Sequence, residues 1–484
     1  MKHSILCTAL FGLTLLAAPR VRAVTVTWIS PDSGYWGDGS NWAGGSMPVN
    51  GDDVVLGTHS AATNDVYAIY SSSYTGAGLN SLTIDAVGIT GTFTLYQPFV
   101  IGGAMVANNE YIGRTTTRNV YEQGGGTNTV ANGLFLAGYV SSGSSSGAYN
   151  LYGGLLDAGT EYVGYYSTNT LNQFHQTGGG NTANYEIIGY GDFLGHGGVG
   201  AYTQDSGYHH VNNALYLGYG YDSTGTYTLN GGTLYADSEG IGAGGTGHFY
   251  QTGGSHTIAH ALTLGSNFSG NETYDLSGTG TLSTTDEIIG ESGYGSQATF
   301  TQSGRVNTAS GKLYVGYSDS GGGAVYTLGK YVLSGGALMA SEEHIGEYDV
   351  GTSILAGGTF NQAGGTFIQT GGTNQISYAL SLGYRSTGSG VYQFSGRALS
   401  ANLDFIGYDG TGTFTQSGGT NTVNINMVLG YNTGSSGAYS ISGTGIVNAL
   451  FETVGDSGTG SFTQTGGTNT ASNILWVLAA LEGF

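Results

Sequence analysis

Apolar and polar residues alternate along this chain in short stretches separated by Gly, Ser, Thr and Asn. In the segment Gly412-Thr-Phe414-Thr-Gln416, for example, Phe414 and Gln416 would share one face of an extended strand. A period of two, bounded by turn-forming residues, is typical of β-strands. We find no amphipathic stretch of ten or more residues with helical spacing. The pattern therefore predicts an all-β protein built from many short strands.

One motif recurs throughout the sequence: an aromatic residue, any residue and Gln, followed by a Gly-rich turn and Asn-Thr. Gln416 and Gln464 belong to two strong copies, and the aromatic residues Phe414, Tyr439 and Phe462 divide the unit between them into two nearly equal halves. Weaker copies occur at residues 121–129, 174–182, 202–211, 249–257, 300–308 and 367–375. A fixed period, here of roughly 48 residues, indicates stacked repeats in which one unit cannot bury its own apolar face.

Two or three short strands in about 24 residues fit one coil of a β-solenoid, stacked on the next coil at about 4.8 Å. A period of about 48 residues also overlaps the blade length of a β-propeller, but the half-repeat favours coils. We therefore predict a β-solenoid (parallel β-helix) of ~24-residue coils in ~48-residue double repeats over residues 101–484. Residues 24–100 hold three of the four Trp residues. We predict that they form an N-terminal β cap over the first strand edges.

The N-terminal segment, residues 1–23, has the features of a secretory signal peptide. Lys2 and His3 precede an apolar run over residues 5–18, which is too short to span a bilayer, and cleavage is expected after Ala23. The single cysteine, Cys7, lies in this segment, so the mature chain would carry no disulfide. We therefore expect a protein that is secreted to the extracellular space or the cell surface, with no membrane insertion.

The net charge is −21, although charged residues make up only 8% of the chain. An acidic surface of this kind opposes binding to nucleic acid and to anionic lipid. Loosely held Ca²⁺ outside the cell is compatible with the charge but is not required, and we expect no cofactor.

The sequence resembles a known family in two features. One is the N-terminal series Trp36, Asn41-Trp42, Pro48 and Asp52-Asp53. The other is the pair of units Phe-Thr-Gln-x-Gly-Gly-Thr-Asn-Thr and Leu-x-Leu-Gly-Tyr. Together they resemble secreted bacterial proteins with autotransporter-associated and PEP-CTERM-type β-strand repeats, over nearly the whole mature chain. The resemblance implies an extracellular, surface or matrix protein, in a family mostly without assigned chemistry.

An acidic residue recurs just before x-Ile/Val-Gly, at Glu110, Glu161, Glu186, Glu239, Glu287, Glu343, Asp404 and Glu452. Most recur every second coil, so neighbours would lie roughly 10 Å apart, too far for a shared metal or a retaining glycosidase pair. We expect coil-corner carboxylates that accept backbone N–H bonds rather than a calcium or glycan stripe. The Gln series shares strand parity with the inward aromatic residues, so we expect interior amides paired with backbone groups of adjacent coils. It comprises Gln123, Gln176, Gln204, Gln251, Gln302, Gln369, Gln416 and Gln464.

A Tyr residue follows the Gly that closes many half-repeats, and this series is the best candidate for ligand binding. Such rings on one face can stack on sugars, or they can stack on each other and seal the turns. The series comprises Tyr139, Tyr165, Tyr190, Tyr219, Tyr317, Tyr384, Tyr408 and Tyr431. The Thr-Asn-Thr segments, as at 127–129 and 420–422, are interpreted as a turn followed by the start of a strand. His209 and His210 should point to opposite sides of a strand, so they are not expected to share one ion.

No catalytic sequence motif is recognised. The acidic, Gln and Tyr residues are repeated many times, whereas an active site would be unique. We therefore expect a secreted structural or adhesive scaffold of a bacterial surface or matrix, without catalysis. The expected partners are an extracellular polysaccharide, another cell-surface protein, or further copies of the rod joined end to end or laterally. The alternatives are a polysaccharide-binding protein using the Tyr series and a polysaccharide lyase or hydrolase. A cluster of acidic and basic residues would favour the enzyme, but the basic residues after Arg118 are dispersed.

Overall fold

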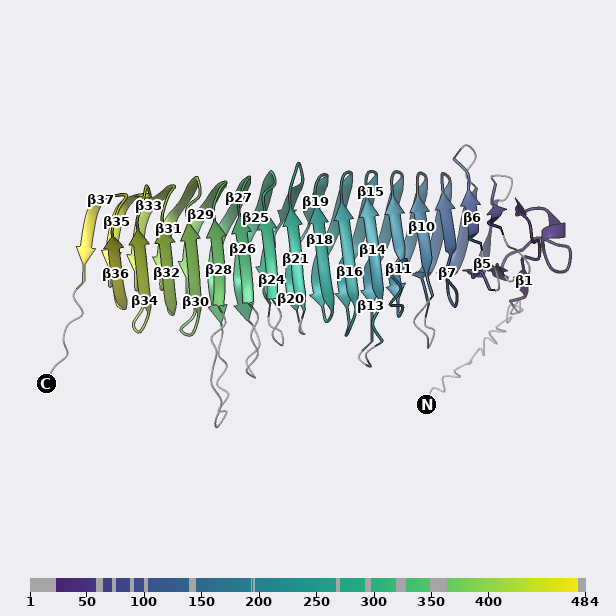
Figure 1. Cartoon of the computed structure of the whole chain (residues 1–484), viewed down its shortest axis with the longest axis horizontal. Helices are drawn as coiled ribbons and strands as arrows, with labels where there is room; N and C mark the ends of the chain where they lie inside the picture. The colour runs from purple at the N-terminus through teal and green to yellow at the C-terminus, as the bar shows by residue number, and fades with distance from the viewer. Residues whose placement is uncertain are drawn as a thin grey trace, which may run out of the picture.

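The chain forms a long rod of stacked coils, with the N-terminal end on the right and the C-terminal end on the left of Figure 1. This computed structural model describes residues 23–57, 64–71, 75–87, 91–99, 103–138, 145–192, 194, 196–266, 270–291, 297–318, 328–348 and 364–477. The expected signal peptide, with Cys7, lies almost wholly outside these ranges.

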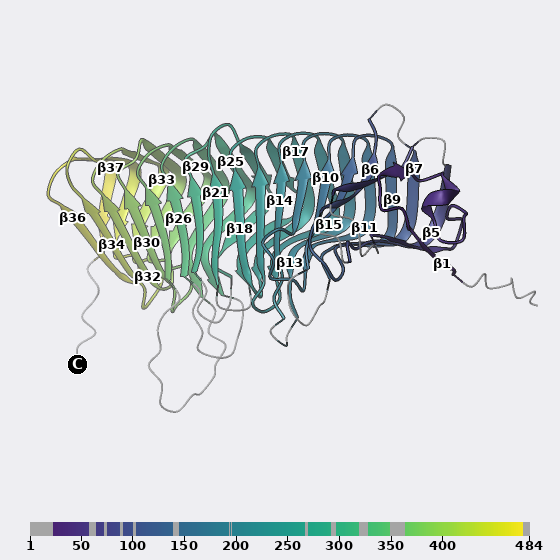
Figure 2. The same cartoon turned by 45° about the vertical axis from the view of Figure 1, so that its right-hand side comes forward.

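Each coil contributes to two sheets whose strands run across the long axis of the rod (Figures 1 and 2). Sheet I contains β1 (Thr25–Thr27), β3 (Asp53–Leu56), β5 (Thr75–Ile84), β7 (Ala104–Ile112), β9 (Thr127–Leu136), β11 (Leu155–Tyr165), β13 (Gly180–Tyr190), β15 (Tyr208–Tyr219), β17 (Thr233–Ala243), β19 (Ser255–Ile258), β20 (Ala261–Ser266), β22 (Thr281–Thr284), β23 (Asp286–Ile289), β25 (Val306–Ser318), β27 (Ala337–Tyr348), β29 (Thr373–Leu382), β31 (Ala398–Ile406), β33 (Thr420–Leu429), β35 (Ile446–Val454) and β37 (Thr468–Trp476). Sheet II contains β2 (Gly34–Tyr35), β4 (Val66–Ile69), β6 (Phe93–Gln97), β8 (Asn119–Gln123), β10 (Gly147–Leu151), β12 (Gln173–Gln176), β14 (Val199–Gln204), β16 (Thr224–Leu229), β18 (Thr246–Gln251), β21 (Asn271–Leu276), β24 (Gln297–Gln302), β26 (Leu328–Leu333), β28 (Gly364–Gln369), β30 (Ser389–Phe394), β32 (Thr411–Gln416), β34 (Ser436–Ile441) and β36 (Thr459–Gln464).

All pairings between these strands are parallel and keep equivalent residues of successive coils side by side. Phe414 on β32, for example, pairs with Tyr439 on β34, and Tyr439 pairs with Phe462 on β36. The result is about sixteen turns of a parallel β-solenoid with coils of about 25 residues. The predicted coil architecture is confirmed, and the propeller alternative is excluded.

A column of aromatic rings runs through the interior along sheet II. Neighbouring ring centroids lie 4.5 to 5.4 Å apart, close to the spacing of the strands themselves. The column consists of Tyr121, Tyr149, Phe174, Tyr202, Tyr227, Phe249, Tyr274, Phe300, Tyr331, Phe367, Tyr392, Phe414, Tyr439 and Phe462. Alternation along each strand places these rings inside and their sequence neighbours outside, as Thr413 and Thr415 on β32 show, in agreement with the predicted period of two.

Glycine ends most strands of sheet I at a point where the chain must turn sharply. Gly407, after β31, has a φ of 77°, and a Cβ there would collide with the main-chain oxygen of Ser436 in the next coil. Only glycine combines a positive φ with so close an approach of two backbones. The apolar-Gly pair that closes each half-repeat therefore marks the corner of a coil.

The N-terminal region continues both sheets rather than forming a distinct unit. β1 pairs in parallel with β3, and β2 pairs in parallel with β4. Trp28, Trp36 and Trp42 are buried in edge-to-face contact at this end of the core, beside the 3₁₀ helix η1 (Gly39–Asn41). The separate β cap expected over residues 24–100 is therefore not confirmed, because its strands already stack as coils.

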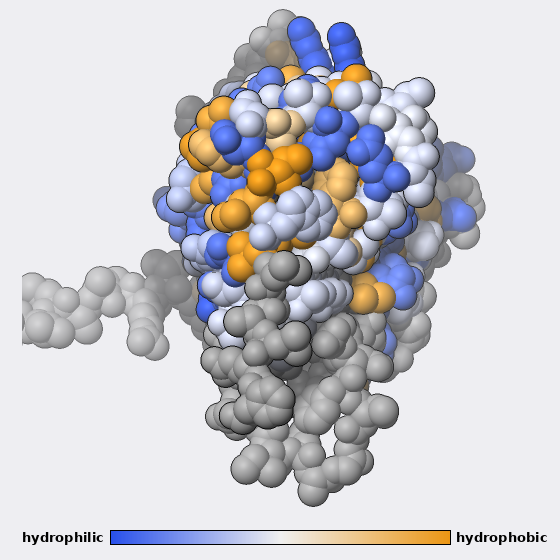
Figure 3. Space-filling view, turned by 90° about the vertical axis from the view of Figure 1, so that its left-hand side faces the viewer, coloured by the Kyte–Doolittle hydropathy of each residue, from blue (hydrophilic) through white to orange (hydrophobic). Residues whose placement is uncertain are grey.

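The last coil described leaves its apolar side chains uncovered. Ile474 and Trp476 on β37 are 51% and 60% exposed, although their equivalents in earlier coils are buried. Figure 3 looks onto this end and shows hydrophobic residues gathered across it. Among the described residues, no helix is long and apolar enough to cross a membrane.

Candidate functional site

The recurring acidic residues lie in the interior of the solenoid, on strands of sheet I. All eight are at most 2% exposed. The expectation that they sit at coil corners and accept backbone N–H bonds is wrong. Where a hydrogen bond to one of these carboxylates is seen among the described residues, a side chain donates it, most often an Asn such as Asn374, whose Nδ2 lies 3.1 Å from Glu343 Oε2. These carboxylates are therefore part of the core and are out of reach of a polymer on the outside.

Seven of the eight carboxylates each belong to a group of four polar side chains from three successive coils, which we call a polar quartet. In one quartet Asn374 Nδ2 donates to Glu343 and also to the Tyr392 hydroxyl oxygen, at 3.1 Å each. Tyr392 donates to Gln369 Oε1 at 2.7 Å, and Gln369 Nε2 donates to the main-chain oxygen of Ala398 at 2.8 Å. The predicted pairing of the Gln series with backbone groups of adjacent coils is confirmed at its Nε2 end.

The same arrangement recurs along the rod, with Tyr drawn from the aromatic column. Where Asn is replaced, His209 and His256 occupy its place between the carboxylate and the tyrosine hydroxyl. The complete quartets are Glu110-Asn128-Tyr149-Gln123, Glu161-Asn181-Tyr202-Gln176, Glu186-His209-Tyr227-Gln204, Glu239-His256-Tyr274-Gln251, Glu287-Asn307-Tyr331-Gln302, Glu343-Asn374-Tyr392-Gln369 and Asp404-Asn421-Tyr439-Gln416. Glu452, Asn469 and Gln464 form the beginning of another in the last coil.

Burial shifts the acidity of the quartet carboxyls strongly. It raises the pKa of Glu343 to about 8, against the opposing donor Asn374. It likewise raises the pKa of Glu110, Glu287 and Asp404 to about 7. Desolvation disfavours the charged form of an acid, and here it outweighs the hydrogen bond that favours it. These four carboxyls therefore keep their proton to a higher pH than exposed carboxyls do.

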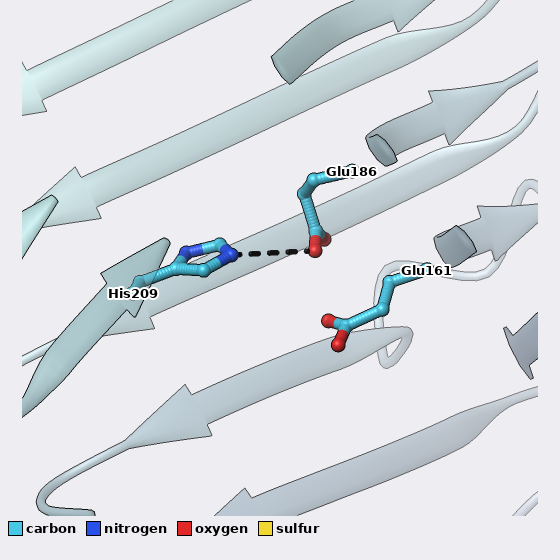
Figure 4. Close-up of side chains that lie close together, drawn as sticks. All are labelled: Glu161, Glu186 and His209. Atoms are coloured by element: carbon cyan, nitrogen blue, oxygen red, sulfur yellow. Dashed lines mark ion pairs between the residues drawn. The ribbon is translucent and has the colours of Figure 1, made fainter. Parts of the chain in front are cut away.

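Most coils carry either the Asn or the carboxylate of a quartet, and Leu fills the other place. The coil of Glu343 has Leu338 in the place of Asn, and the coil of Asn374 has Leu380 in the place of Glu. One exception occurs at β11, β13 and β15, where Glu161 and Glu186 are direct neighbours in register. One carboxyl oxygen from each Glu and one ring nitrogen of His209 lie within 4.8 Å of one another, and Figure 4 shows the imidazole pointing at Glu186. This pair is an exception to the predicted spacing of two coils, which most of the carboxylates keep.

The histidine pair behaves as predicted from strand parity. His209 is 1% exposed inside the core, whereas His210 lies on the outer side and stacks on Tyr235, with ring centroids 4.4 Å apart. The two therefore share no ion. The Thr-Asn-Thr segments begin strands as predicted, at Thr127, Thr420 and Thr468. The central Asn of these segments was not predicted to be a hydrogen-bond donor in the interior. The replacement of this Asn by Leu in alternate coils could have indicated that its side chain points inward.

The tyrosines of the candidate ligand series lie half-buried on the outside of sheet I, in two runs. Tyr165, Tyr190 and Tyr219 stack successively, with centroids 5.1 and 5.8 Å apart. Tyr384 and Tyr408 stack at 4.9 Å, followed by a tilted contact to Tyr431 at 5.1 Å. Tyr317 packs against Tyr314, and Tyr139 lies outside the described residues. Stacking within each run therefore covers ring faces that a ligand would otherwise contact.

Two surface hollows lie elsewhere on the rod. One, of about 430 Å³, is lined by aromatic rings of Tyr67, Tyr96, Phe99 and Tyr152 with the carboxylate of Glu122. Phe99 is 60% exposed, and its ring centroid lies 6.1 Å from that of Tyr152. The other, of about 460 Å³, runs over the bend of sheet I and is lined mainly by Ser, Thr and Asn, among them Ser377, Asn402 and Asn424.

Comparison with known proteins gives no relative: no family model, no curated protein and no solved structure matches this chain.

Proposed function

We propose that the protein is a secreted structural or adhesive scaffold of a bacterial surface or matrix, of the autotransporter-associated and PEP-CTERM repeat type, and that it has no catalytic activity. The observation that carries this proposal is the burial of the recurring ionisable groups. The carboxylates, glutamines and tyrosines of the quartets lie in the interior and stabilise it, so these recurring groups are not displayed on the outer surface. A polymer on the outside meets no quartet carboxylate.

A rod suits a structural role because its length scales with the number of coils. At the spacing of parallel strands, sixteen coils extend roughly 75 Å. Every coil is hydrogen-bonded to its neighbours along two sheets, so the rod resists bending. The net charge of −21 would keep such rods apart from anionic surfaces.

Polysaccharide binding is the second candidate, and the aromatic hollow favours it. Exposed rings at Tyr67 and Phe99 beside the Glu122 carboxylate offer flat apolar faces together with a hydrogen-bond acceptor. Sugar recognition uses this combination, because one face of a pyranose is apolar and its rim carries hydroxyl groups. Stacking covers ring faces in the half-buried tyrosine runs, so we place the hollow ahead of them.

Three measurements separate these functions. Cell fractionation of the native host tests secretion, and electron microscopy of the purified chain tests for single rods of the length expected from the stacking of its coils. A glycan array with a parallel reducing-sugar release assay then distinguishes a scaffold from a binder and from an enzyme. Binding lost in Phe99→Ala but kept in Tyr408→Ala assigns the ligand to the hollow, and the reverse assigns it to the tyrosine series. Release of reducing sugar would overturn the non-catalytic proposal, and retention of the chain in the cytoplasm would overturn secretion.

A further inference from the structure

Coils that carry the Asn or His of a quartet regularly alternate with coils that carry its carboxylate. The alternation fails at β13, which carries both Asn181 and Glu186, and the failure brings two carboxyl groups together. In the other complete quartets the carboxylate has Leu or Met beside it in the coils above and below, as Leu215 and Leu262 flank Glu239. Glu186 instead pairs in register with Glu161 on the preceding coil. Both side chains are at most 1% exposed. Two ionised carboxylates at this separation in a core would repel strongly, so the site needs either a shared proton or a bound cation.

The third member of the site is His209, and its hydrogen bonds fix which ring nitrogen carries the proton. Gln204 Nε2 donates to two main-chain carbonyls, so its Oε1 is the acceptor for the Tyr227 hydroxyl, at 2.7 Å. Because the Tyr227 hydroxyl already donates its proton to Gln204, the Tyr227 oxygen accepts a hydrogen bond from His209 Nδ1 at 3.1 Å. In the neutral ring, Nε2 then carries no proton and offers a lone pair. Nε2 lies 3.6 Å from Glu186 Oε2. A metal-bound histidine has this arrangement, with its outer nitrogen held by a hydrogen bond.

Four atoms at the centre of the site have no hydrogen-bond partner among the described residues, apart from the hydrogen bond that Glu161 and Glu186 form with each other when one of them is protonated. They are both carboxyl oxygens of Glu186, Oε1 of Glu161 and Nε2 of His209. The second oxygen of Glu161 is already occupied, because Asn181 Nδ2 donates to it at 3.0 Å. The unoccupied atoms belong to the three side chains that converge, with one ligand atom from each within 4.8 Å of the others (Figure 4). Buried polar atoms are rarely left unpaired, and here several acceptors face each other.

We propose that Glu161, Glu186 and His209 bind one divalent transition-metal ion of the zinc class inside the solenoid. Nitrogen and carboxylate oxygen ligands at about 2.0–2.2 Å in tetrahedral geometry lie roughly 3.4 Å apart. The 3.6 Å between His209 Nε2 and Glu186 Oε2 fits this value with little movement. A dication with two carboxylates also makes the buried group neutral. Three ligands with one nitrogen do not fit Ca²⁺, which takes six to eight oxygens.

The metal would link three successive coils through β11, β13 and β15, and the second unpaired oxygen of Glu186 would supply the fourth ligand atom of a site closed to solvent. The neighbouring His256 provides an internal control for this inference. Its Nε2 lies 3.0 Å from Glu239 Oε2, and it likewise contacts a tyrosine hydroxyl, of Tyr274, through Nδ1. Only one carboxyl group is present there, so a single shared proton satisfies the pair. We therefore expect a metal at His209 and none at His256.

The test is the metal content of the full chain, expressed in medium supplemented with zinc and measured by elemental mass spectrometry after gel filtration. We expect about one zinc per chain in the wild type and in His256→Asn. We expect less than about 0.1 per chain in His209→Asn and in Glu186→Leu. Both site variants restore residues found at the same place in other coils, such as Asn181 and Leu215, so they should retain the fold by circular dichroism.

Two results would overturn the proposal. One is wild-type protein that carries less than about 0.1 equivalent of zinc after zinc-supplemented growth, and of cobalt after cobalt-supplemented growth; a shared proton would then satisfy the site. The other is zinc retained in both site variants, which would place the ion elsewhere. Because the wild-type content decides the first result alone, a variant that fails to fold leaves the test intact.

Discussion

Replacement of one buried carboxyl group by its amide should make the rod more resistant to alkaline conditions. Glu343 is fully buried, and its pKa is raised to about 8 from 4.5 by burial, with Asn374 opposing and Asp404 and Glu287 adding to the rise. The folded state therefore holds a proton between pH 4.5 and 8 that the unfolded state releases. The free energy of unfolding must then fall as the pH rises through this window. Glu343→Gln removes this contribution, because an amide remains neutral.

The expected size follows from the shift. One pKa unit corresponds to about 1.4 kcal/mol, so the wild type loses about 5 kcal/mol through this residue between pH 4.5 and pH 8. At pH 4.5 wild type and variant should agree within about 1 kcal/mol, since the Gln oxygen can still accept from Asn374. The unfolding entropy is about 2.1 cal/mol/K per residue, and the chain has 484 residues. The variant should therefore melt about 5 °C higher at pH 8.5, and more if only part of the rod unfolds as one unit.

Differential scanning calorimetry of both proteins from pH 4.5 to pH 9 measures this difference directly. An outward residue change on the same strand, Glu342→Gln, serves as the control, because the carboxyl of Glu342 is partly exposed and its pKa is lowered. Burial opposes that lowering, which hydrogen bonds from His344 and Lys312 produce. The control should not gain stability at high pH. Parallel melting curves for wild type and Glu343→Gln across this range, or a variant less stable at pH 8.5, would refute the reasoning.

Three further changes test the quartet and the coil corner. Tyr392→Phe removes the donor to Gln369 Oε1 and should cost about 1–3 kcal/mol, read from the urea midpoint at unchanged slope; no change would mean that the hydroxyl is not part of the network. Asn374→Leu removes the donor to the buried carboxyl, so it should cost about 3–5 kcal/mol at pH 8.5 and less at pH 4.5, where the carboxyl is neutral. A loss independent of pH would contradict this assignment. Gly407→Ala should prevent stable folding or lower the melting temperature by many degrees, whereas Gly434→Ala, also at positive φ but with open space around it, should cost only about 1 kcal/mol by the same measurement; equal effects would contradict the collision at the corner.

The sequence was sufficient for the architecture because the relevant signals are local. Strand parity places Phe414 and Gln416 on one face, and both are buried in the structure. The long period with its half-repeat gives the coil length, since identical side chains must meet in a parallel stack. The separate cap was predicted from a change in composition, and composition does not show whether strands such as β1 and β3 stack as further coils.

The quartets could not be predicted, because their members come from different coils. Glu343 and Asn374 are 31 residues apart, and Tyr392 follows 18 residues later. Strand parity states that each points inward, but not which inward residue of the next coil it contacts. The hypothesis of coil-corner carboxylates correctly required hydrogen-bond donors for the carboxyl groups. It assigned backbone N–H groups as these donors, whereas the structure shows side chains. The contact of Glu161, Glu186 and His209 depends further on one break in the alternation, which a consensus repeat conceals.

The repeat of two coils has a physical explanation in the way the quartet residues are distributed over successive coils. If every coil carried Glu, Asn and Gln, like carboxyl groups would lie one strand spacing apart along the whole rod, and each would lower the stability of its neighbours. If every coil carried Leu, any coil could stack on any other, and the register between coils would be weakly specified. Alternation avoids both the repulsion and the weak register. A shift by one coil would place the amide donors of Asn374 against Leu instead of a carboxyl group, so the shifted register would be less stable. It follows that the coils around Glu186, where the alternation is broken, need another stabilising element, which the proposed metal ion supplies.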